Sequence, residues 1–343
     1  MIPQKQLDQI KEELAYCKRP IFFFHDDPDG LCSFLLLYRF VGGGKAVAVK
    51  TVPRLTKEIF AKKVEDYGAD KVFILDLAEV EDDFIKAVKK PIVWIDHHEP
   101  QHPRGVKYFN PRIQNKDEYS PVTYWCYKVI NQDLWVSVIG CIGDMFYPPF
   151  MEEFKKQYPG LVDIRTRNCT EIVYETKLGK LVRIFSFALK GKTKDVMNCV
   201  KVLTRIQSPY EILDQSTSQG KFIYKHYEKI YDEYKKLFNE AKKVRPEKGV
   251  LYFTYRSKIS LTKDIANELT HKYPNALVMV GREKHDEIKF SIRWNKNISI
   301  ILEKALKQVE GYGGGHKFAC GAVIKVKDIL KFLKIVKEEV SKA

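Results

Sequence analysis

The sequence predicts an α/β protein with an N-terminal parallel-sheet domain, a helical connector and a smaller C-terminal α/β domain. Three observations lead to this prediction. First, the chain has 343 residues, which is more than one hydrophobic core usually organises. Second, the first half alternates apolar runs of strand length with amphipathic stretches of helix length, which is typical of a parallel sheet covered by helices. Third, helical periodicity dominates after residue 134 and strand patterns return only after residue 248. We expect the three parts to span residues 1–215, 216–246 and 247–343.

Within the first part, predicted strands mostly alternate with predicted helices, and no internal repeat is visible. We expect strands at residues 20–25, 46–52, 71–76, 91–96 and 106–110. We expect helices at residues 4–17, 30–41, 56–67, 82–88 and 122–131. Ligands of such sheets bind beyond the carboxyl ends of the strands, so the residues that follow these strands are the candidates for a site.

The rest of the chain divides into a helical stretch and a second α/β pattern. Helices are expected at residues 193–205 and 224–243, and residues 159–175 are expected to form a loop or a short hairpin insertion. In the last part, strands at residues 250–255, 276–280 and 288–293 alternate with helices at residues 261–272, 298–308 and 329–342.

Composition limits the classes of function. Lys and Arg exceed Asp and Glu by 59 to 44, and the resulting net charge of +15 favours phosphate-rich partners, although heat-adapted proteins also carry such solvated charged faces. The apolar runs are too short for a membrane span, and the N-terminal stretch lacks the features of a secretory signal, so we expect a cytoplasmic protein without a membrane partner. Seven scattered cysteines with no C-x-x-C pair disfavour a zinc ribbon and a disulfide framework.

Four apolar segments end in side chains that ligate metals. The strand at residues 20–25 leads into His25-Asp26-Asp27-Pro28-Asp29, and the later segments end in Asp76, in Asp96-His97-His98 and in Asp144. Any one of these could be a turn or a helix cap, but four together indicate a metal site. Imidazole combined with carboxylate suits Mn²⁺, Fe²⁺ or Zn²⁺, whereas carboxylates alone suit Mg²⁺. We therefore expect Mn²⁺ in preference to Mg²⁺.

These segments carry a family resemblance. The H-x-D-x-D-G at His25, the strand-end Asp76, the D-H-H at Asp96 and the G-D at Asp144 resemble, in order and spacing, the four motifs of the DHH phosphoesterase superfamily. The segment Gly311-Tyr312-Gly313-Gly314-Gly315-His316 is similar to the glycine-rich motif of the DHHA1 domain. The chain is thus identified as a RecJ-like, archaeal member of the DHH–DHHA1 family.

The resemblance implies a two-metal site. It implies that Asp27 and Asp29 each serve one metal, that Asp76 bridges both, and that His97 and Asp144 ligate the second. His25 would ligate the first metal, His98 would approach the scissile phosphate, and Asp96 would orient an imidazole, as carboxylates commonly do beside metal-bound histidine. Independently, two cations about 3.5–4 Å apart repel strongly without a shared carboxylate, and Asp76 is the candidate for that bridge.

Substrate contacts are expected mainly from the last part of the chain. Clustered glycines let backbone N–H groups approach a phosphate closely, so Gly313, Gly314, Gly315 and His316 are candidates, although a plain turn is the alternative for a lone glycine-rich loop. Arg293 resembles the DHHA1 arginine that contacts phosphate. Arg112, in Asn110-Pro111-Arg112, could join the same cleft, and a simple Pro turn is the alternative there.

The resulting hypothesis is a metal-dependent exonuclease or oligonucleotidase that hydrolyses short single-stranded RNA or DNA to nucleoside monophosphates with two divalent cations. A small-nucleotide phosphatase or dinucleotide hydrolase acting on pAp-like substrates would use the same metal site. An inorganic pyrophosphatase shares the D-H-H chemistry but has a different second domain. A Cdc45-like replication scaffold is the non-enzymatic alternative, and such relatives lose metal-site residues. A second copy of the chain, or a replication or RNA-processing protein, stays open as a partner.

Overall fold

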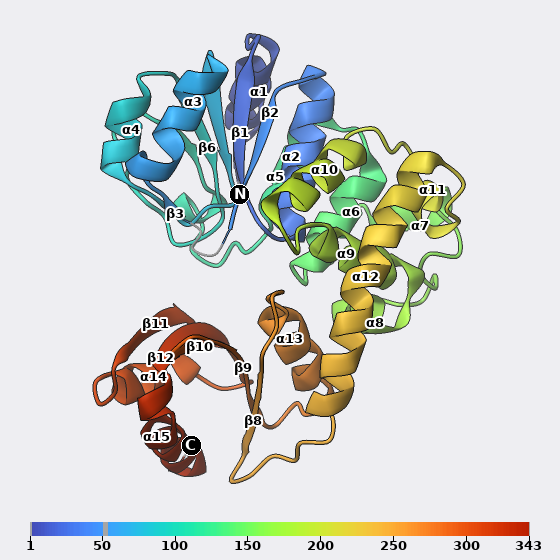
Figure 1. The fold of residues 1–343 in the computed structure, drawn as a ribbon. Helices are drawn as coiled ribbons and strands as arrows, with labels where there is room; N and C mark the ends of the chain where they lie inside the picture. The colour runs from blue at the N-terminus through green and yellow to red at the C-terminus, as the bar shows by residue number, and fades with distance from the viewer. Residues whose placement is uncertain (1, 51–53, 343) are drawn as a thin grey trace. The chain divides into compact units, whose positions relative to one another are not determined.

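The computed structural model describes residues 2–50 and 54–342, which form two compact units, Met1–Tyr227 and Glu228–Ala343. Helix α12 (Ser218–Ala241) runs across the boundary between them (Figure 1). None of the helices in this described part combines the length and the apolar character that crossing a membrane requires. The predicted α/β class is confirmed, with a parallel sheet in the first unit and a separate sheet in the second.

The first unit is built on a five-stranded parallel sheet with the strand order β2-β1-β4-β6-β7. Its central strands are almost entirely buried, as expected for strands covered on both faces. The strands are β1 (Pro20–His25), β2 (Lys45–Val49), β4 (Lys71–Leu75), β6 (Ile92–Ile95) and β7 (Lys107–Phe109). Each corresponds to a predicted strand, but Val52, at the end of the second prediction, lies outside the described residues. The short strands β3 (Arg54–Leu55) and β5 (Glu79–Val80) form a separate pair.

Helices cover both faces of this sheet, as Figure 1 shows for α3 and α4 on one side and α2 on the other. Phe23 of β1 packs edge-on against Phe60 and Phe84, with ring centroids 5.7 and 5.8 Å apart. The predicted helix at residues 56–67 is a π-helical turn, η1 (Lys57–Ala61), followed by α3 (Lys62–Tyr67). The other helices here are α1 (Gln4–Ala15), α2 (Pro28–Val41), α4 (Asp82–Val88), η2 (Pro111–Ile113) and α5 (Val122–Ile130).

The remainder of the first unit is helical. The apolar run before Asp144 forms α6 (Leu134–Gly143), which is buried along nearly its whole length. Of the two alternatives for residues 159–175, the structure has a loop rather than a hairpin, and this loop leads into the unpredicted helix α8 (Cys169–Glu175), whose first turn is capped by Asn168. The other helices are α7 (Met151–Gln157), α9 (Lys177–Ala188), α10 (Thr193–Leu203) and α11 (Pro209–Leu213).

A buried lysine holds the loop before α8. The Lys155 side chain is only 3% exposed and pairs with Glu152 at 3.2 Å. Its Nζ donates to the carbonyl oxygens of Ile164 and Thr166, both at 2.9 Å. One ammonium group thus binds two backbone acceptors of an otherwise irregular loop, of which the Ile164 carbonyl also accepts from Arg167 at 3.1 Å.

Replacing Lys155 with Met should lower the melting temperature by about 5–10 °C. The substitution removes both charged hydrogen bonds and leaves the buried Thr166 carbonyl without this donor, which costs about 2–4 kcal/mol. Differential scanning fluorimetry measures the shift, and Lys156→Met, at an exposed position of the same helix, is the matched control. Equal melting temperatures for the two variants would contradict the anchoring role of Lys155.

The second unit contains a mixed sheet with the order β11-β12-β10-β9-β8, in which β8 and β9 are parallel and the other pairs antiparallel. Phe290 of β10 and Phe332 of α15 belong to its hydrophobic core. The strands are β8 (Val250–Tyr255), β9 (Leu277–Lys284), β10 (Glu287–Arg293), β11 (Gly311–His316) and β12 (Ala319–Lys325). The helices are α13 (Thr262–Lys272), α14 (Ile298–Leu306), η3 (Val326–Asp328) and α15 (Ile329–Lys342).

The glycine-rich segment corrects the expectation of a loop. Residues 311–316 form the edge strand β11, and they pair with β12, a strand that the sequence patterns did not predict. A Cβ atom on Gly313 would lie 2.5 Å from the carbonyl oxygen of Gly321, so the missing side chain allows the two backbones to approach closely. Glycine serves strand packing here, a use that strand propensities do not anticipate.

Candidate metal centre

The ends of three parallel strands deliver the candidate ligands to one edge of the first sheet. Strand β1 ends at His25, β4 ends one residue before Asp76, and β6 ends one residue before Asp96. Because these strands are neighbours and parallel, their carboxyl ends meet at the same edge. Asp144 does not follow a strand of this sheet; it is the residue at the C-terminal end of the buried helix α6.

Asp76 lies at the centre of the cluster, with its two carboxylate oxygens facing different histidines. Oδ2 of Asp76 lies 3.2 Å from Nδ1 of His25, and Oδ1 lies 3.3 Å from Nε2 of His97. The same His25 nitrogen lies 3.0 Å from Oδ2 of Asp27. His25, Asp27 and Asp76 thus present three ligand atoms within 4.8 Å of one another, which is a spacing that a metal ion can span.

A second group of ligand atoms lies on the other side of Asp76. Nε2 of His97 lies 3.7 Å from Oδ2 of Asp144 and 3.9 Å from Oδ2 of Asp29. Asp29, His97 and Asp144 also lie within 4.8 Å of one another. Mixed imidazole and carboxylate donors on both sides of one carboxylate fit a pair of divalent cations such as Mn²⁺.

Asp29 is held by the start of helix α5. Its two oxygens accept hydrogen bonds from the backbone N–H groups of Thr123 and Val122, at 2.7 and 2.9 Å. Its backbone carbonyl accepts a further hydrogen bond from the Thr123 hydroxyl at 2.9 Å. The carboxylate is buried, so these donors and the positive end of the helix dipole compensate part of the cost of burial.

The main partner of His98 is Asp96, although Nδ1 of His98 also lies 3.9 Å from Oδ1 of Asp76, which His97 contacts as well. Nδ1 of His98 lies 2.7 Å from Oδ1 of the fully buried Asp96 and donates this hydrogen bond. The backbone N–H of His98 also donates to Asp96, at 3.1 Å. Asn110 in turn donates to the backbone carbonyl of His98 at 3.0 Å. Asp96 and Asn110 therefore orient His98.

Close approaches of the backbone make this geometry possible. A Cβ atom on Gly30 would lie 2.4 Å from the carbonyl oxygen of His25, so only glycine lets α2 begin this close to β1. A Cβ atom on Gly140 would lie 2.4 Å from Oγ1 of Thr123, which lets α6 carry Asp144 alongside α5. Asp76 itself has a φ of 58°, a left-handed conformation that is uncommon for residues other than glycine and often marks a functional site.

Burial and neighbouring charges shift the pKa values of three candidate ligands, His25, His97 and Asp29. Burial lowers the pKa of His25, but Asp27 and Asp76 overcome this effect and raise that pKa well above its usual value. For His97, burial likewise lowers the pKa, whereas the hydrogen bond with Asp76 and the charge of Asp144 raise it well above the usual range. Burial and the charge of Asp76 raise the pKa of Asp29. Neighbouring negative charge contributes to each of these shifts, and bound cations would neutralise it.

Mn²⁺ affinity should therefore fall as the pH decreases through neutrality. A cation binds neutral imidazole, and the raised pKa values of His25 and His97 mean that protons compete with the metal at a higher pH than they would for ordinary histidines. Isothermal titration calorimetry at pH 6.5, 7.5 and 8.5, in buffers of different ionisation enthalpy, measures both the affinity and the protons released. An affinity independent of pH over this range would contradict the assignment of these histidines.

The predicted substrate-binding residues lie in both units. Arg112, on η2, pairs with Glu99 at 2.9 Å and does not belong to the ligand groups described above. In the second unit, Arg293 donates from Nε to Oδ1 of Asn267 at 2.7 Å, so its guanidinium is oriented. Arg293, Ala319 and His316 occupy one row across β10, β12 and β11. Gly313, Gly314 and Gly315 continue along exposed β11, and the side chain of His316 lies outside the described part.

Two contributors to the centre were missed by sequence reasoning. Asn110 was noted only as a neighbour of Arg112, although an amide directly after strand β7 is a recognisable signal at a sheet edge. The backbone donors of Val122 and Thr123 have no side-chain signature, so only the arrangement of α5 against Asp29 reveals them.

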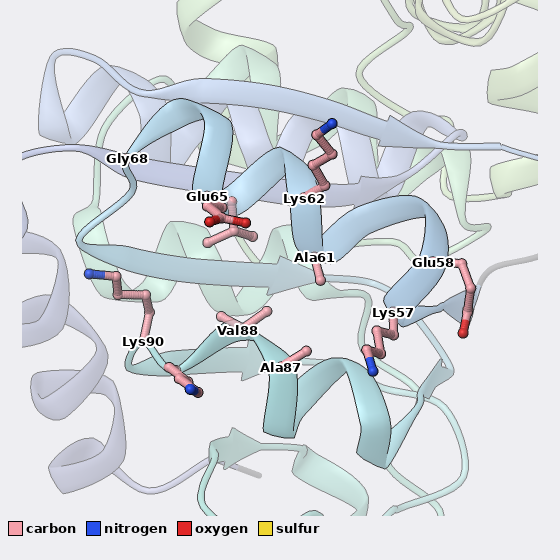
Figure 2. A pocket seen from close by; sticks show the side chains of 11 residues that line it. Lys57, Glu58, Ala61, Lys62, Glu65, Gly68, Ala87, Val88 and Lys90 are labelled. Carbon is pink, nitrogen blue, oxygen red and sulfur yellow. The ribbon is translucent and has the colours of Figure 1, made fainter.

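A separate cavity of about 850 Å³ lies between η1, α3 and α4, and it includes none of the candidate ligands. Figure 2 shows the small side chains of Ala61, Ala87 and Val88 between these elements, with Lys57 at one end of the groove and Lys90 at the other. Glu58 and Glu65 offset part of the lysine charge. Mixed charges of this kind are typical of a solvated groove.

Comparisons with known proteins match each unit separately. Residues 21–142 match the model of the DHH family, N-terminal domain, and residues 257–342 match the model of the DHHA1 domain. Among the sequences of curated proteins, none matches the chain significantly.

Solved structures share the fold at low sequence identity. RecJ from Thermus thermophilus in complex with Mn²⁺ has a TM-score of 0.70 at 13% identity, and the match covers 100% of this chain and 55% of that chain. Exonuclease RecJ bound to manganese has a TM-score of 0.66 at 14% identity, and the match covers 100% of this chain and 96% of that chain. A third structure is the DHH domain of a protein described as a member of the s1p family of ribosomal proteins. Its TM-score is 0.67 at 17% identity, and the match covers 98% of this chain and 90% of that chain. The chain therefore spans just over half the length of Thermus RecJ.

Proposed function

The chain belongs to the DHH–DHHA1, RecJ-like family, and on this basis we propose that it is a metal-dependent phosphoesterase that hydrolyses short single-stranded RNA or DNA to nucleoside monophosphates. The net charge of +15 supports a substrate that carries several phosphates. The two RecJ structures named above contain manganese, which supports the choice of metal.

The observation that carries this proposal is the position of Asp76 between two groups of ligands. In the proposal, His25, Asp27 and Asp76 hold one divalent cation, while Asp29, His97 and Asp144 hold a second with the help of Asp76. Bound in this way, the cations stabilise negative charge on the phosphate and lower the pKa of a water molecule to produce the nucleophile. A single structural metal would not need a buried carboxylate with a histidine at each oxygen.

His98 has a separate role in the proposal. Asp96 accepts the hydrogen bond from Nδ1 of His98, so Nε2 is the nitrogen that can contact substrate. Burial lowers the pKa of His98, but the hydrogen bond with Asp96 raises it above its usual value. The imidazolium form therefore persists to a higher pH, and its Nε2–H can donate to a phosphate oxygen as negative charge develops there.

The second unit would hold the substrate rather than cleave it. Arg293 presents a guanidinium that Asn267 orients, and such a group suits bidentate contact with phosphate. The exposed glycines of β11 lie at the edge of the sheet, where the backbone N–H groups that do not pair with β12 could contact a phosphate. Removal of these contacts should raise KM more than it lowers kcat.

The test is a length series. The protein is incubated with Mn²⁺ and with end-labelled RNA and DNA ranging from dinucleotides to 20-mers, and the products are identified by mass spectrometry. Release of nucleoside monophosphates from short strands supports the proposal. Cleavage of dinucleotides alone would favour a dinucleotide hydrolase, and hydrolysis of inorganic pyrophosphate without any nucleotide product would overturn the proposal.

A further inference from the structure

Three large exposed side chains lie within three positions, along the chain, of residues of the candidate metal centre. Tyr119 is 64% exposed, Ile113 is 54% exposed and Met145 is 50% exposed. Large apolar side chains with this much exposure near a polar centre often belong to a binding surface. These three residues lie in the first unit, so their arrangement does not depend on the second.

Each of the three is tied by a short connection to a residue of the centre. Met145 directly follows Asp144 and has a φ of 58°, so the backbone turns sharply at that carboxylate. Tyr119 lies three residues before Val122, whose N–H group binds Asp29. Ile113 lies three residues after Asn110, whose amide binds the carbonyl of His98.

Tyr119 has the geometry of a prepared stacking surface. The guanidinium carbon of Arg112 lies 5.3 Å from the centre of the Tyr119 ring, within cation–π distance. With Arg112 over one face and 64% of the residue exposed, the opposite face of the ring is available to a ligand.

Arg112 is itself held in place. It pairs with Glu99 at 2.9 Å and donates from Nε to the carbonyl oxygen of Lys116 at 3.1 Å. Its own N–H donates to Oδ1 of Asn110 at 2.9 Å. The Tyr119 ring therefore rests on an anchored side chain, which reduces the entropy lost when a ligand stacks on it.

The loop that carries Met145 is anchored beside the same helix. Phe146, the next residue, packs edge-on against Tyr124 with ring centroids 5.4 Å apart. Tyr124 lies in the first turn of α5, directly after Thr123, which donates to Asp29. Met145 therefore adjoins, along the chain, a residue that packs on the first turn of α5, and Tyr119 precedes that helix by three positions.

We propose that Tyr119, supported by Arg112, binds the nucleobase adjacent to the cleaved phosphate. The ligand class is a purine or pyrimidine ring, because a flat π-face backed by a guanidinium stacks on any base. This inference rests on the proposed phosphoesterase function and deepens it, since it places base recognition in the first unit. An inorganic polyphosphate has no group that would use this surface.

The test compares an adenine dinucleotide with the same molecule lacking the base next to the cleaved phosphate. For the wild-type protein with Mn²⁺, removal of the base should lower kcat/KM by about ten-fold or more. Tyr119→Ala should cause a similar loss on the complete dinucleotide and little further loss on the abasic one. Tyr119→Phe, which keeps the ring, should retain most of the activity.

Tyr16→Ala is the matched control, because Tyr16 is 76% exposed and lies at the end of α1. Equal losses on both substrates for Tyr119→Ala, or no loss on either, would overturn the inference. A dinucleotide containing 2-aminopurine gives a reading that needs no turnover, because stacking on Tyr119 should quench its fluorescence. Quenching that disappears in Tyr119→Ala supports the base site even if the protein cleaves nothing, and absence of quenching in the wild type overturns it.

Discussion

Replacing Asp76 with Asn should reduce phosphodiester hydrolysis by about 10³-fold or more, because one side chain serves both ligand groups. An amide has the same shape as the carboxylate but carries no charge and offers only one oxygen. The oxygens that face His25 and His97 would no longer be equivalent, so one of the two groups would lose its shared ligand. Initial rates on a short oligonucleotide with Mn²⁺ measure the loss, and calorimetry measures how many Mn²⁺ ions bind.

The same substitution should leave the fold intact, which separates loss of chemistry from loss of structure. Burial and the charge of Asp27 raise the pKa of Asp76, although hydrogen bonds from His25 and His97 bring it below its usual value. A pKa below its usual value means that the folded state favours the charged carboxylate at neutral pH, so Asp76→Asn should lower the metal-free melting temperature without unfolding the protein. Asp66→Asn, at an exposed position of α3, is the matched control. Wild-type turnover and Mn²⁺ stoichiometry in the Asp76 variant would disprove the central role of Asp76.

The second large effect is expected from Asp96→Asn, which should lower kcat by about 10²-fold while Mn²⁺ binding persists. Asp96 is fully buried and contacts His98 rather than His97. Without its carboxylate, His98 loses the acceptor that fixes the ring and favours its charged form. Steady-state kinetics and calorimetric Mn²⁺ titration on the same preparation separate the two effects.

His98→Asn should reproduce the loss in kcat, and the double variant should be no slower than either single variant, because both act through one imidazole. His102→Asn, at an exposed histidine a few residues away, should behave as the wild type. If Asp96→Asn instead weakened Mn²⁺ binding as strongly as Asp76→Asn, Asp96 would have to be reassigned as a ligand.

Predictions from local patterns succeeded where a single segment supplied the whole signal. Strands β1 and β8 and helices α4 and α15 begin and end at the predicted residues, because a continuous apolar run or a helical stripe identifies them without reference to the rest of the chain. The metal-ligand assignments stay predictions, but the structure brings all six candidate ligands into the two groups around Asp76.

The failures share one cause, which is competition between local preference and contacts elsewhere. Glycines in β11 have poor strand propensity, yet they pair with β12 because small residues are needed where the two strands approach. Helix α8 was not predicted, and the loop before it, for which the sequence left a loop or a hairpin open, is held in part by buried Lys155 on a different element. Neither arrangement can be read from a window of neighbouring residues.

The sequence by itself determined the fold class, the strands that end in acid or imidazole, and the kind of metal that such residues suit. These features depend on residue type and on spacing along one segment. Only the tertiary structure decided that Asp76 turns one oxygen to His25 and the other to His97. It also decided that a backbone N–H group at the start of α5 binds Asp29 and that Arg112 lies over the Tyr119 ring. His25 and Asp76 are 51 positions apart, and Asp29 and Val122 are 93 positions apart, so these contacts exist only once the sheet and helices have packed.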